Sequence, residues 1–382
     1  MNYITPIISP KERYVFIKQK IAQTLTSAAL VLSVAASNTA FSTGSLCITE
    51  LPTLPTAVAN NAVASVIVND TDYLISFAGI GEGLDYLDIH ARTLVFNRND
   101  NEWSEAAPVP GKEGRLAATA AAVGKLAYVF GGYTVAADGI EVSTPWVHSF
   151  DPVTATFEQL SPMPIPVDDA VSFTYQDRYI YLISGWHDLG NVNLVQRYDT
   201  QTDRWIQATP IPGNSLFGHA GGVVGNKIAY CDGVYVRANA DSKRSFNASS
   251  ECFIGIIDAQ DSRRIDWRPI AAHLGLPRYR MAAAGVESLN SVLFVGGSEN
   301  PYNFDGMGYD GKPSEPAPDA LLFNVETLQW KTLKQGNAPS MDHRGLVPFK
   351  NGWVTVGGME QRQTVSKKVV AYYPEQTKQV CE

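Results

Sequence analysis

A short β-prone run that ends on glycine recurs six times along the chain. Examples are "AYVFGG" (127–132), "IYLISG" (180–185) and "WVTVGG" (353–358). The closing glycines are Gly79, Gly132, Gly185, Gly233, Gly297 and Gly358, at intervals of 53, 53, 48, 64 and 61 residues. Because an interval near 50 residues accommodates four short strands with their turns, the spacing predicts six similar β-units.

A second signature follows five of the six glycines. It consists of a strand end, a polar turn and a bulky aromatic residue that opens the next strand, as in "FDPVTATF" (150–157) and "YDTQTDRW" (198–205). A proline-containing stretch comes next, for example "SPMPIP" (161–166). The fixed order of these features predicts four antiparallel strands per unit, which is the blade of a β-propeller.

The sixth unit stops before its last strand. The missing strand and proline segment have a counterpart at the other end of the mature chain, in "CITELPTLP" (47–55). We therefore predict an all-β, six-bladed propeller over residues 43–382, in which the N-terminal strand completes the last blade. Such closure leaves no open sheet edge.

These motifs resemble those of the kelch-repeat family over essentially all of the mature chain. The resemblance rests on the paired glycines, the polar turn before tryptophan and the proline segment, which recur in the family's order. It implies a kelch β-propeller, in agreement with the fold predicted from the repeat.

The N-terminus has the pattern of a signal peptide. Basic residues precede an apolar run (21–42) rich in Ala, Ser and Thr, and cleavage after Ser42 or after Ala36 leaves small residues at the required positions. A membrane anchor is the alternative, since the run approaches a spanning length, but Gln23 and Asn38 interrupt it. We expect residues 1–42 to be removed and the protein to be periplasmic or secreted, without a membrane segment.

Four cysteines fit an oxidising compartment and allow three disulfide connectivities. Cys231 and Cys252 flank one loop, while Cys47 and Cys381 begin and end the mature chain, on neighbouring strands of the predicted closing blade. We expect the pairs Cys47–Cys381 and Cys231–Cys252. Metal binding is the weaker alternative because the sequence has no CxxC motif or Cys/His cluster, and we expect neither a metal nor a cofactor.

The composition argues against nucleic acid as a partner. The formal net charge of the 382 residues is −8, with a pI near 5.3, and no basic stripe is present. The remaining partner classes are a small molecule and another protein.

The loops on one face of a propeller surround the mouth of its central channel, and here they mix arginines, carboxylates and aromatics. This mixture suits a small anionic ligand such as an acidic sugar. The expected ligand-binding residues are Arg115, Arg280, Arg344, Trp186 and Asp168. Arg115, Asp168 and Arg280 lie 17 residues before the closing glycine of their units, where kelch repeats often hold an arginine, so a structural role is the alternative.

Two segments, 113–132 and 343–360, are similar to the N-acetylneuraminate epimerase (sialic acid mutarotase) group of kelch proteins. The resemblance implies anomer interconversion by proton transfer. From their location near the expected channel mouth, Glu360, Glu299 and His219 are the candidate acid and base. The sequence departs from that group after the glycine of blade 4, where Val234 occupies the place of the catalytic glutamate and Arg237 approximates its arginine partner.

Two other functions are compatible with the fold. A non-catalytic binding propeller needs only the channel mouth, and the missing blade 4 glutamate favours it. A galactose-oxidase-like copper enzyme needs a Cys–Tyr pair and two histidines on the metal, whereas the four cysteines here are expected in disulfides. Whether the protein is an enzyme stays open at this point.

Overall fold

The computed structural model describes residues 43–111, 113–188, 190–239, 244–336 and 339–374, with side chains from residue 46 onward. The predicted signal peptide (1–42) lies outside the described residues. Within them the regular elements are strands and three 3-10 turns: η1 (Tyr86–Asp88), η2 (Glu287–Leu289) and η3 (Gln361–Gln363). The all-β prediction is confirmed.

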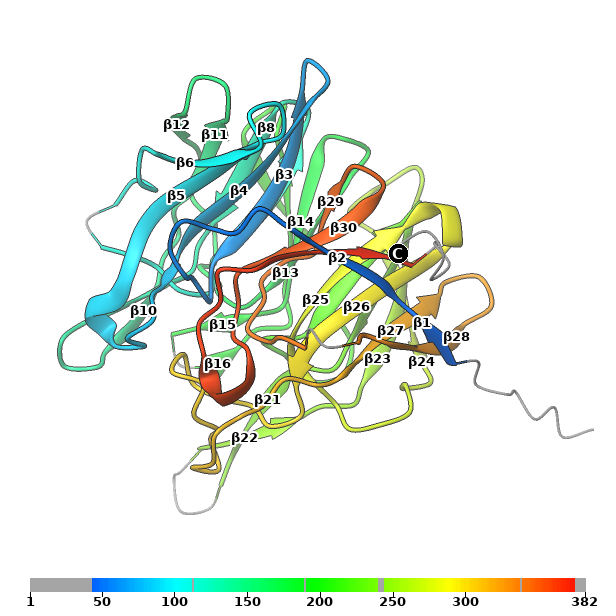
Figure 1. Cartoon of the computed structure of the whole chain (residues 1–382). Coiled ribbons are helices and arrows are strands. Elements are labelled where there is room, and N and C mark those ends of the chain that lie inside the picture. Colours follow the sequence, from blue (N-terminus) through cyan, green and yellow to red (C-terminus); the bar gives the residue numbers. More distant parts are fainter. Residues whose placement is uncertain (1–42, 112, 189, 240–243, 337–338, 375–382) are drawn as a thin grey trace, which may run out of the picture. The chain divides into compact units, whose positions relative to one another are not determined.

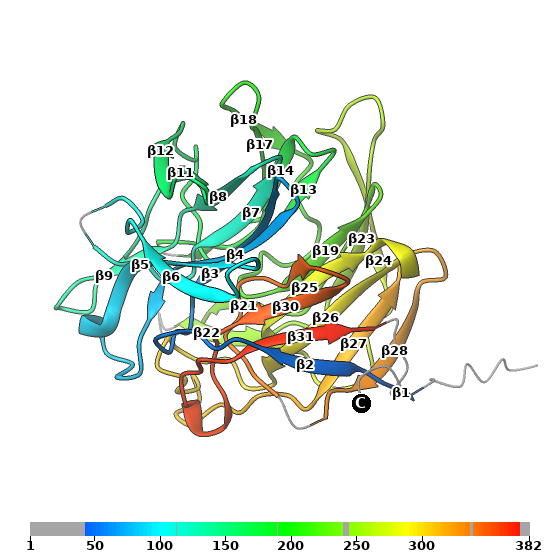
Figure 2. The same ribbon diagram turned by 45° about the horizontal axis from the view of Figure 1, so that its top comes forward.

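Six four-stranded antiparallel blades surround a central channel (Figures 1 and 2). In every blade the strands follow one another from the channel outward. Blade 1 comprises β3 (Ala62–Val68), β4 (Thr71–Ile80), β5 (Ile89–Asn97) and β6 (Glu102–Ala106). Blade 2 comprises β7 (Thr119–Val123), β8 (Leu126–Phe130), β11 (Val147–Asp151) and β12 (Thr156–Gln159). Blade 3 comprises β13 (Val171–Tyr175), β14 (Tyr179–Ile183), β17 (Val195–Asp199) and β18 (Arg204–Ala208). Blades 4 and 5 comprise β19 (Ala220–Val224), β20 (Lys227–Cys231), β23 (Cys252–Ile257), β24 (Ile265–Ile270); and β25 (Tyr279–Val286), β26 (Ser291–Ser298), β27 (Asp319–Asn324), β28 (Gln329–Lys334).

The N-terminal strand closes the ring, as predicted. Blade 6 consists of β29 (Val347–Phe349), β30 (Gly352–Val356), β31 (Val369–Tyr373) and the N-terminal β2 (Cys47–Leu51). β2 runs antiparallel to β31, with Cys47 opposite Tyr373. A shorter strand, β1 (Thr43–Ser45), adds in parallel to β28 of blade 5, so the N-terminal segment holds two blades together (Figure 2). The sequence analysis did not anticipate β1.

One of the two expected disulfides lies within the described residues. Cys231 and Cys252 face each other on β20 and β23 and are bonded, which confirms this pair. Cys47 is also disulfide-bonded. Its predicted partner, Cys381, lies outside the described residues, so the pairing Cys47–Cys381 stays a prediction.

In blades 1, 3, 4 and 5 the tryptophan of the second signature connects the blade to the preceding one. The indole of Trp205 donates a hydrogen bond of 3.0 Å to the carbonyl of Ser161, in the proline segment that follows blade 2. Trp103 makes the same bond to Pro52 at 2.8 Å, across the closure between blades 6 and 1. Buried aromatics pack beside these bonds, as where Trp205 meets Phe130 edge-on at 5.9 Å. The repeated signature is therefore an inter-blade contact.

Two of the closing glycines show why the repeat requires this residue. Gly132 and Gly185 have φ of +83° and +111°, and an added Cβ at either would lie 2.6 Å from a carbonyl oxygen of the linker entering the same blade. Only glycine tolerates both this conformation and this proximity. The next residue then pairs with the linker, Tyr133 with Leu116 and Trp186 with Asp168. The glycines thus position the linkers around the channel.

Short insertions between the second and third strands cover one end of the channel, here called the upper face. Three of them are hairpins: β9 (Tyr133–Val135) with β10 (Glu141–Ser143), β15 (Trp186–His187) with β16 (Gly190–Asn191), and β21 (Val234–Ala238) with β22 (Arg244–Ala248). In blade 5 the insertion is an irregular loop, 299–318, held by the bridges Tyr302–Gly308 and Met307–Pro313.

Candidate functional site

Six linker residues in the left-handed conformation surround the channel. Their φ angles lie between 49° and 66°, and backbone hydrogen bonds join the four from Ala117 to Arg280 in order. The amide of Asp169 donates to the carbonyl of Ala117 (3.0 Å), Gly218 to Asp169 (2.9 Å) and Arg280 to Gly218 (2.7 Å). The six residues are Asn60, Ala117, Asp169, Gly218, Arg280 and Asp342. This arrangement brings side chains from distant parts of the sequence together.

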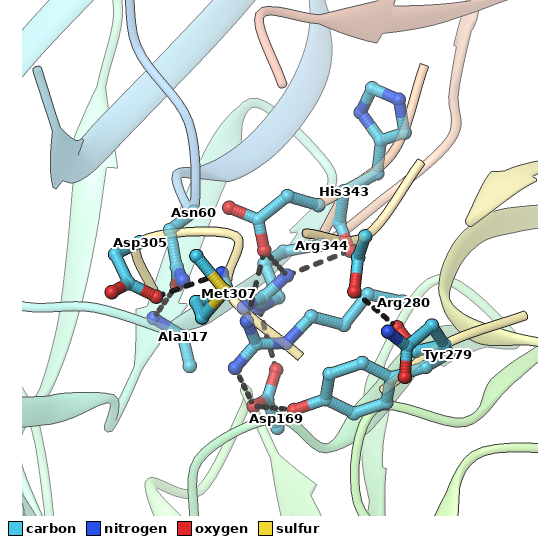
Figure 3. Close-up of polar contacts among 12 residues, drawn as sticks. Asn60, Ala117, Asp169, Tyr279, Arg280, Asp305, Met307, His343 and Arg344 are labelled. Carbon is cyan, nitrogen blue, oxygen red and sulfur yellow. Dashed lines mark hydrogen bonds and ion pairs between the residues drawn. The ribbon is translucent and has the colours of Figure 1, made fainter. Parts of the chain in front are cut away.

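Two arginines and two aspartates meet in this ring and form what we call the ion cluster: Asp169, Arg280, Asp342 and Arg344. Arg280 lies 2.7 Å from Asp169 and 3.2 Å from Asp342. Arg344 lies 2.7 Å from Asp169, through Nε without hydrogen-bond geometry, and 3.2 Å from Asp342. Figure 3 shows Arg280 and Arg344 converging on Asp169. All four side chains are buried, and their charges cancel.

Pairing between opposite charges sets the pKa values of Asp169 and Arg280 in the ion cluster. Burial alone would raise the pKa of Asp169, but Arg280 and Arg344 outweigh it and hold that pKa below its usual value. Burial likewise lowers the pKa of Arg280, and Asp169 more than restores it. The rings of Tyr279 and Tyr302 lie 4.6 and 5.2 Å from the Arg280 guanidinium and shield it from water. The cluster is an internal salt bridge in its charged form.

Above the ion cluster lies a cavity of about 490 Å³, here called the upper pocket. The three hairpins and the blade 5 loop form its walls, and Asp169 and Arg280 form part of its floor. Its aromatic lining is Tyr133, Trp186, Phe217, Phe246, Phe304 and Tyr309. Its charged lining is Glu141, Asp168, Asp169, Asp188, Arg244 and Arg280.

The aromatic wall joins three blades. Phe246 of the blade 4 hairpin stacks on Tyr309 of the blade 5 loop, with ring centres 4.2 Å apart. Trp186 of blade 3 packs against Phe217 at 5.4 Å, and the guanidinium of Arg244 lies over the Trp186 ring at 5.6 Å. The insertions of blades 4 and 5 therefore extend over the channel mouth and enclose the pocket.

The upper pocket also contains carboxyl groups whose pKa values differ. Asp168 is buried and accepts a hydrogen bond of 2.8 Å from the hydroxyl of Ser143. Burial, and then the neighbouring charge of Asp169, raise the pKa of Asp168 well above its usual value. Burial also raises the pKa of Glu141. Adjacent carboxyls whose pKa values are pushed apart are a common arrangement for acid–base chemistry.

A much smaller cavity, about 40 Å³, lies beneath the ion cluster. Its lining includes His219, and neither ring nitrogen of this histidine has a hydrogen-bond partner. Burial lowers the pKa of His219 to about 4, so the ring is neutral at physiological pH. Deeper in the channel is a chamber of about 610 Å³, the lower chamber, lined by small residues such as Ala121, Gly222 and Ala284 together with Trp353.

The structure brings some of the residues expected from the sequence together and separates others. Asp168, Trp186 and Arg280 line the upper pocket. Arg344 and His219 lie beneath it, around the small cavity. The three expected acid–base residues do not converge, because Glu299 and Glu360 lie outside both cavities.

Glu360 accepts hydrogen bonds from Ser366 (2.6 Å) and Lys368 (2.9 Å) in a groove of about 520 Å³ at the side of blade 6. Glu299 is exposed and lines none of these cavities. Arg115 is buried and donates to the carbonyls of Gly131 (3.2 Å) and Pro110 (2.7 Å). These contacts favour the structural alternative for Arg115.

Sequence reasoning did not single out Glu141, Phe246 or Asp342. Asp342 could have been found from "MDHRG" (341–345), where an aspartate precedes the expected arginine by two residues. Glu141 and Phe246 lie on hairpins inserted between the repeated second and third strands of blades 2 and 4, and the repeat carries no information about such insertions.

Two searches of the described residues were negative. No three His, Cys, Asp or Glu side chains in these ranges are grouped as a metal site requires. None of the described helices is long and apolar enough to span a bilayer.

Known proteins share the fold with this chain. Residues 114–164 match the kelch motif. Kelch-like protein 15 from Homo sapiens is 23% identical over 262 residues, which are 68% of this chain and 41% of that protein. The Gallus gallus protein of the same name is 28% identical over 165 residues, 43% of this chain and 32% of its own length. The match therefore spans about two fifths or less of these relatives.

A solved structure, that of YjhT, superposes on most of the chain. The TM-score is 0.66 at 18% sequence identity, and the alignment covers 86% of this chain and 98% of that one. At this identity the likeness concerns the fold. The chain is thus a six-bladed β-propeller that carries a kelch motif.

Proposed function

We propose that the protein is a ligand-binding propeller whose upper pocket binds a small polyhydroxylated molecule, a carbohydrate. The single observation that carries the proposal is the upper pocket itself. It is a cavity of about 490 Å³ whose lining combines aromatic rings with carboxyl groups. Ligand sites in proteins are concave, largely apolar and equipped with a few polar groups that fix orientation.

The chemistry of this lining suits a sugar. The C–H faces of a pyranose pack against aromatic rings such as Trp186 and Phe246, while its hydroxyls donate to carboxylate oxygens. The volume accommodates a mono- or disaccharide rather than a polymer. Binding alone needs no further group, and this agrees with Val234 in the place of the catalytic glutamate of the sialic acid mutarotases.

The charge of the sugar is a separate question. An acidic sugar was expected because Arg280 and Arg344 were candidates for its carboxylate. In the ion cluster both arginines are already paired with Asp169 and Asp342. An acidic ligand would have to displace these pairs or rely on Arg244 at the pocket wall, so its binding stays a prediction to be tested beside neutral sugars.

A matched pair of tryptophan variants tests the binding proposal. Trp186 lines the pocket, whereas Trp146 is 44% exposed and outside it. Titration of the mature protein with glucose, glucosamine and N-acetylneuraminate should show saturable binding of at least one sugar. Trp186→Ala should weaken that binding about tenfold or more, while Trp146→Ala leaves it unchanged. Equal effects of both variants, or no binding of any sugar, would refute the proposal.

Anomer interconversion is a second candidate, favoured by the carboxyl pair Asp168 and Asp169. A neutral Asp168 can donate its proton to the ring oxygen while an ionised carboxylate takes the proton of the anomeric hydroxyl. The bond between the anomeric carbon and the ring oxygen then breaks, and reclosure on either face returns both protons.

Proton NMR of freshly dissolved α-N-acetylneuraminate or α-glucose measures this reaction. The proposal expects exchange faster than in buffer and its loss in Asp168→Asn. Exchange at the buffer rate in the parent protein would leave binding as the function.

We further propose that the protein acts outside the cytoplasm, in an oxidising compartment where the Cys231–Cys252 disulfide persists. Fractionation of cells that express the full chain tests this location.

A further inference from the structure

The charges lining the upper pocket are unbalanced. Four carboxyl groups line it against two guanidinium groups, those of Arg244 and Arg280. Arg280 is committed to Asp169 and Asp342 in the ion cluster. Among the described lining residues, Glu141, Asp168 and Asp188 add three carboxyl groups, and Arg244 adds one guanidinium group.

We propose that the upper pocket selects a positively charged ligand, an amino sugar or a comparable polar amine, over neutral and anionic ones. The inference rests on the proposed function, since it names the ligand class of the same site. An unbalanced negative charge in a partly desolvated cavity attracts a cation more strongly than it would in water.

Within the described ranges of the chain, neither lysine nor arginine forms an ion pair with Glu141, Asp168 or Asp188. Asp168 accepts its hydrogen bond from the neutral Ser143 hydroxyl. Asp188 accepts a backbone bond of 3.0 Å from Ser143 and has the imidazole of His187 at 3.9 Å. Among the described residues, Glu141 has no ion pair within 4.0 Å. An ammonium group of a ligand can therefore pair with any of the three.

The aromatic wall also favours a cation. The guanidinium of Arg244 already lies over the Trp186 ring at 5.6 Å, so the protein itself places a positive group against this face. Phe246 and Tyr309, whose ring centres lie 4.2 Å apart, line the same cavity. Aromatic faces next to carboxylates are the usual surroundings of bound ammonium groups in proteins.

The raised pKa values of two carboxyl groups in the pocket also favour a cationic ligand. Burial raises the pKa of Asp168 and of Glu141, since no sufficient positive charge offsets their desolvation. A bound cation would favour the ionised carboxylates and lower both pKa values. Binding of an amine is therefore expected to release protons, whereas binding of an anion would take them up. The groups that enter this balance are Glu141, Asp168, Asp169, His187, Asp188, Arg244 and Arg280.

Three hexopyranoses of similar size and different charge test the inference: glucosamine, glucose and glucuronate. Calorimetric titrations are run at a pH where the amine is protonated, in two buffers of different ionisation enthalpy, so that proton release is measured together with affinity. The expected order of affinity is glucosamine, glucose, glucuronate, with about tenfold between the first and the last. Protons should be released only with glucosamine.

The variant Glu141→Gln/Asp188→Asn removes two carboxyl charges from the pocket lining at residues that are only partly buried, and the new amide oxygens keep the acceptor role of the old side chains. It should lower the affinity for glucosamine about tenfold more than the affinity for glucose, because the amide oxygens that replace the carboxylates still accept hydrogen bonds from hydroxyls but carry no charge. The control Glu158→Gln, on the exposed outer strand β12, should change neither. Salt should weaken glucosamine binding selectively.

The outcomes separate the two proposals. If glucuronate binds as tightly as glucosamine or more tightly, and Trp186→Ala still abolishes binding, the pocket is a sugar site and the charge preference is wrong. If the double variant lowers the affinities for glucose and glucosamine equally, the carboxyl groups do not select charge and the inference is also wrong. If none of the three sugars binds, the proposed function fails, and the inference fails with it.

Discussion

The guanidinium of Arg280 lies 2.7 Å from the carboxylate of Asp169, although 111 residues separate them in the sequence. The contact crosses the channel from the linker of blade 5 to the linker of blade 3, and Asp342 extends it to blade 6. Arg280 adopts a φ of +57°, which an arginine rarely does. The ion cluster thus connects three blades at the level where the upper pocket has its floor.

Asp169→Asn should destabilise the protein strongly. The substitution leaves Arg280 and Arg344 buried with Asp342 as their remaining carboxylate, and loss of one partner from a buried ion pair costs about 3–5 kcal/mol. Urea unfolding followed by tryptophan fluorescence measures the change. The control Asp266→Asn removes an exposed ion pair with Arg268 and should cost less than about 1 kcal/mol. Equal effects of the two variants would show that the cluster contributes no more than a surface pair.

His219 should make the protein sensitive to acid. Its pKa falls from 6.5 to about 4 on folding, so the unfolded chain binds a proton in this interval and the folded chain does not. The contribution of His219 to stability is complete above 6.5 and is lost as the pH falls towards about 4. Between pH 7 and pH 5 the parent should lose about 2 kcal/mol more unfolding free energy than His219→Gln.

The comparison with His219→Gln isolates this effect. Asp168 has a raised pKa and contributes with the opposite sign, but it is present in both proteins and cancels in the difference. Parallel pH profiles of unfolding free energy for the two proteins would contradict a neutral, buried His219.

Gly185→Ala should disturb the pocket as well as the fold. The new Cβ would lie 2.6 Å from the carbonyl oxygen of Asp168, at a φ of +111°. We expect a loss of about 2–3 kcal/mol in thermal or urea unfolding and weaker sugar binding, because Asp168 and Trp186 pair directly beside this glycine. Gly190→Ala is the matched control, since its Cβ would meet nothing within 4 Å, and it should stay within about 0.5 kcal/mol of the parent. A larger loss in the control than in Gly185→Ala would refute this role of Gly185.

The fold could be predicted because its signals are local and repeated. Gly132 and Gly185 are required by backbone conformation, and Trp205 by an inter-blade hydrogen bond, so each leaves a mark at a fixed spacing. The closing strand was found because blade 6 lacked one. β1 was missed because its parallel pairing with β28 follows no repeat.

Linker residues at the same distance in sequence from their closing glycine do not occupy equivalent positions in the structure. Arg115, Asp168 and Arg280 all lie 17 residues before their glycines. In the structure Asp168 itself pairs across the linker, Arg115 precedes the pairing residue by one and Arg280 follows it by one. The hairpins between the first two strands differ in length, and a shift of one residue reverses the direction of a side chain. Arg115 therefore faces backbone carbonyls, and Arg280 faces the channel.

Charge pairing was the other part of the site that the sequence did not reveal. Arg280 and Arg344 suggested an anion site, but Asp169, which pairs with both, comes from the linker of another blade, and Asp342, which also pairs with both, was not singled out. Trp186 was found because it departs from the repeat. Phe246 and Tyr309 approach each other only after two unrelated insertions fold over the channel.

The location of the ligand is the central claim, and the tryptophan side chains report on it directly. Of the seven tryptophans, Trp186 lines the upper pocket and Trp353 lines the lower chamber. Their indole N–H groups donate to the backbone carbonyls of Asp188 (3.1 Å) and Gly285 (3.2 Å), which makes both suitable NMR probes. Phenylalanine substitutions at the two positions assign the signals in a protein labelled with ¹⁵N-tryptophan.

The decisive measurement is a titration of this labelled protein with glucosamine and with glucose. The account predicts a saturable shift of the Trp186 signal with either sugar, larger for glucosamine, while the Trp353 signal stays in place. Saturable shifts of Trp353 without a change at Trp186, or an unchanged Trp186 signal throughout both titrations, would contradict a ligand site in the upper pocket.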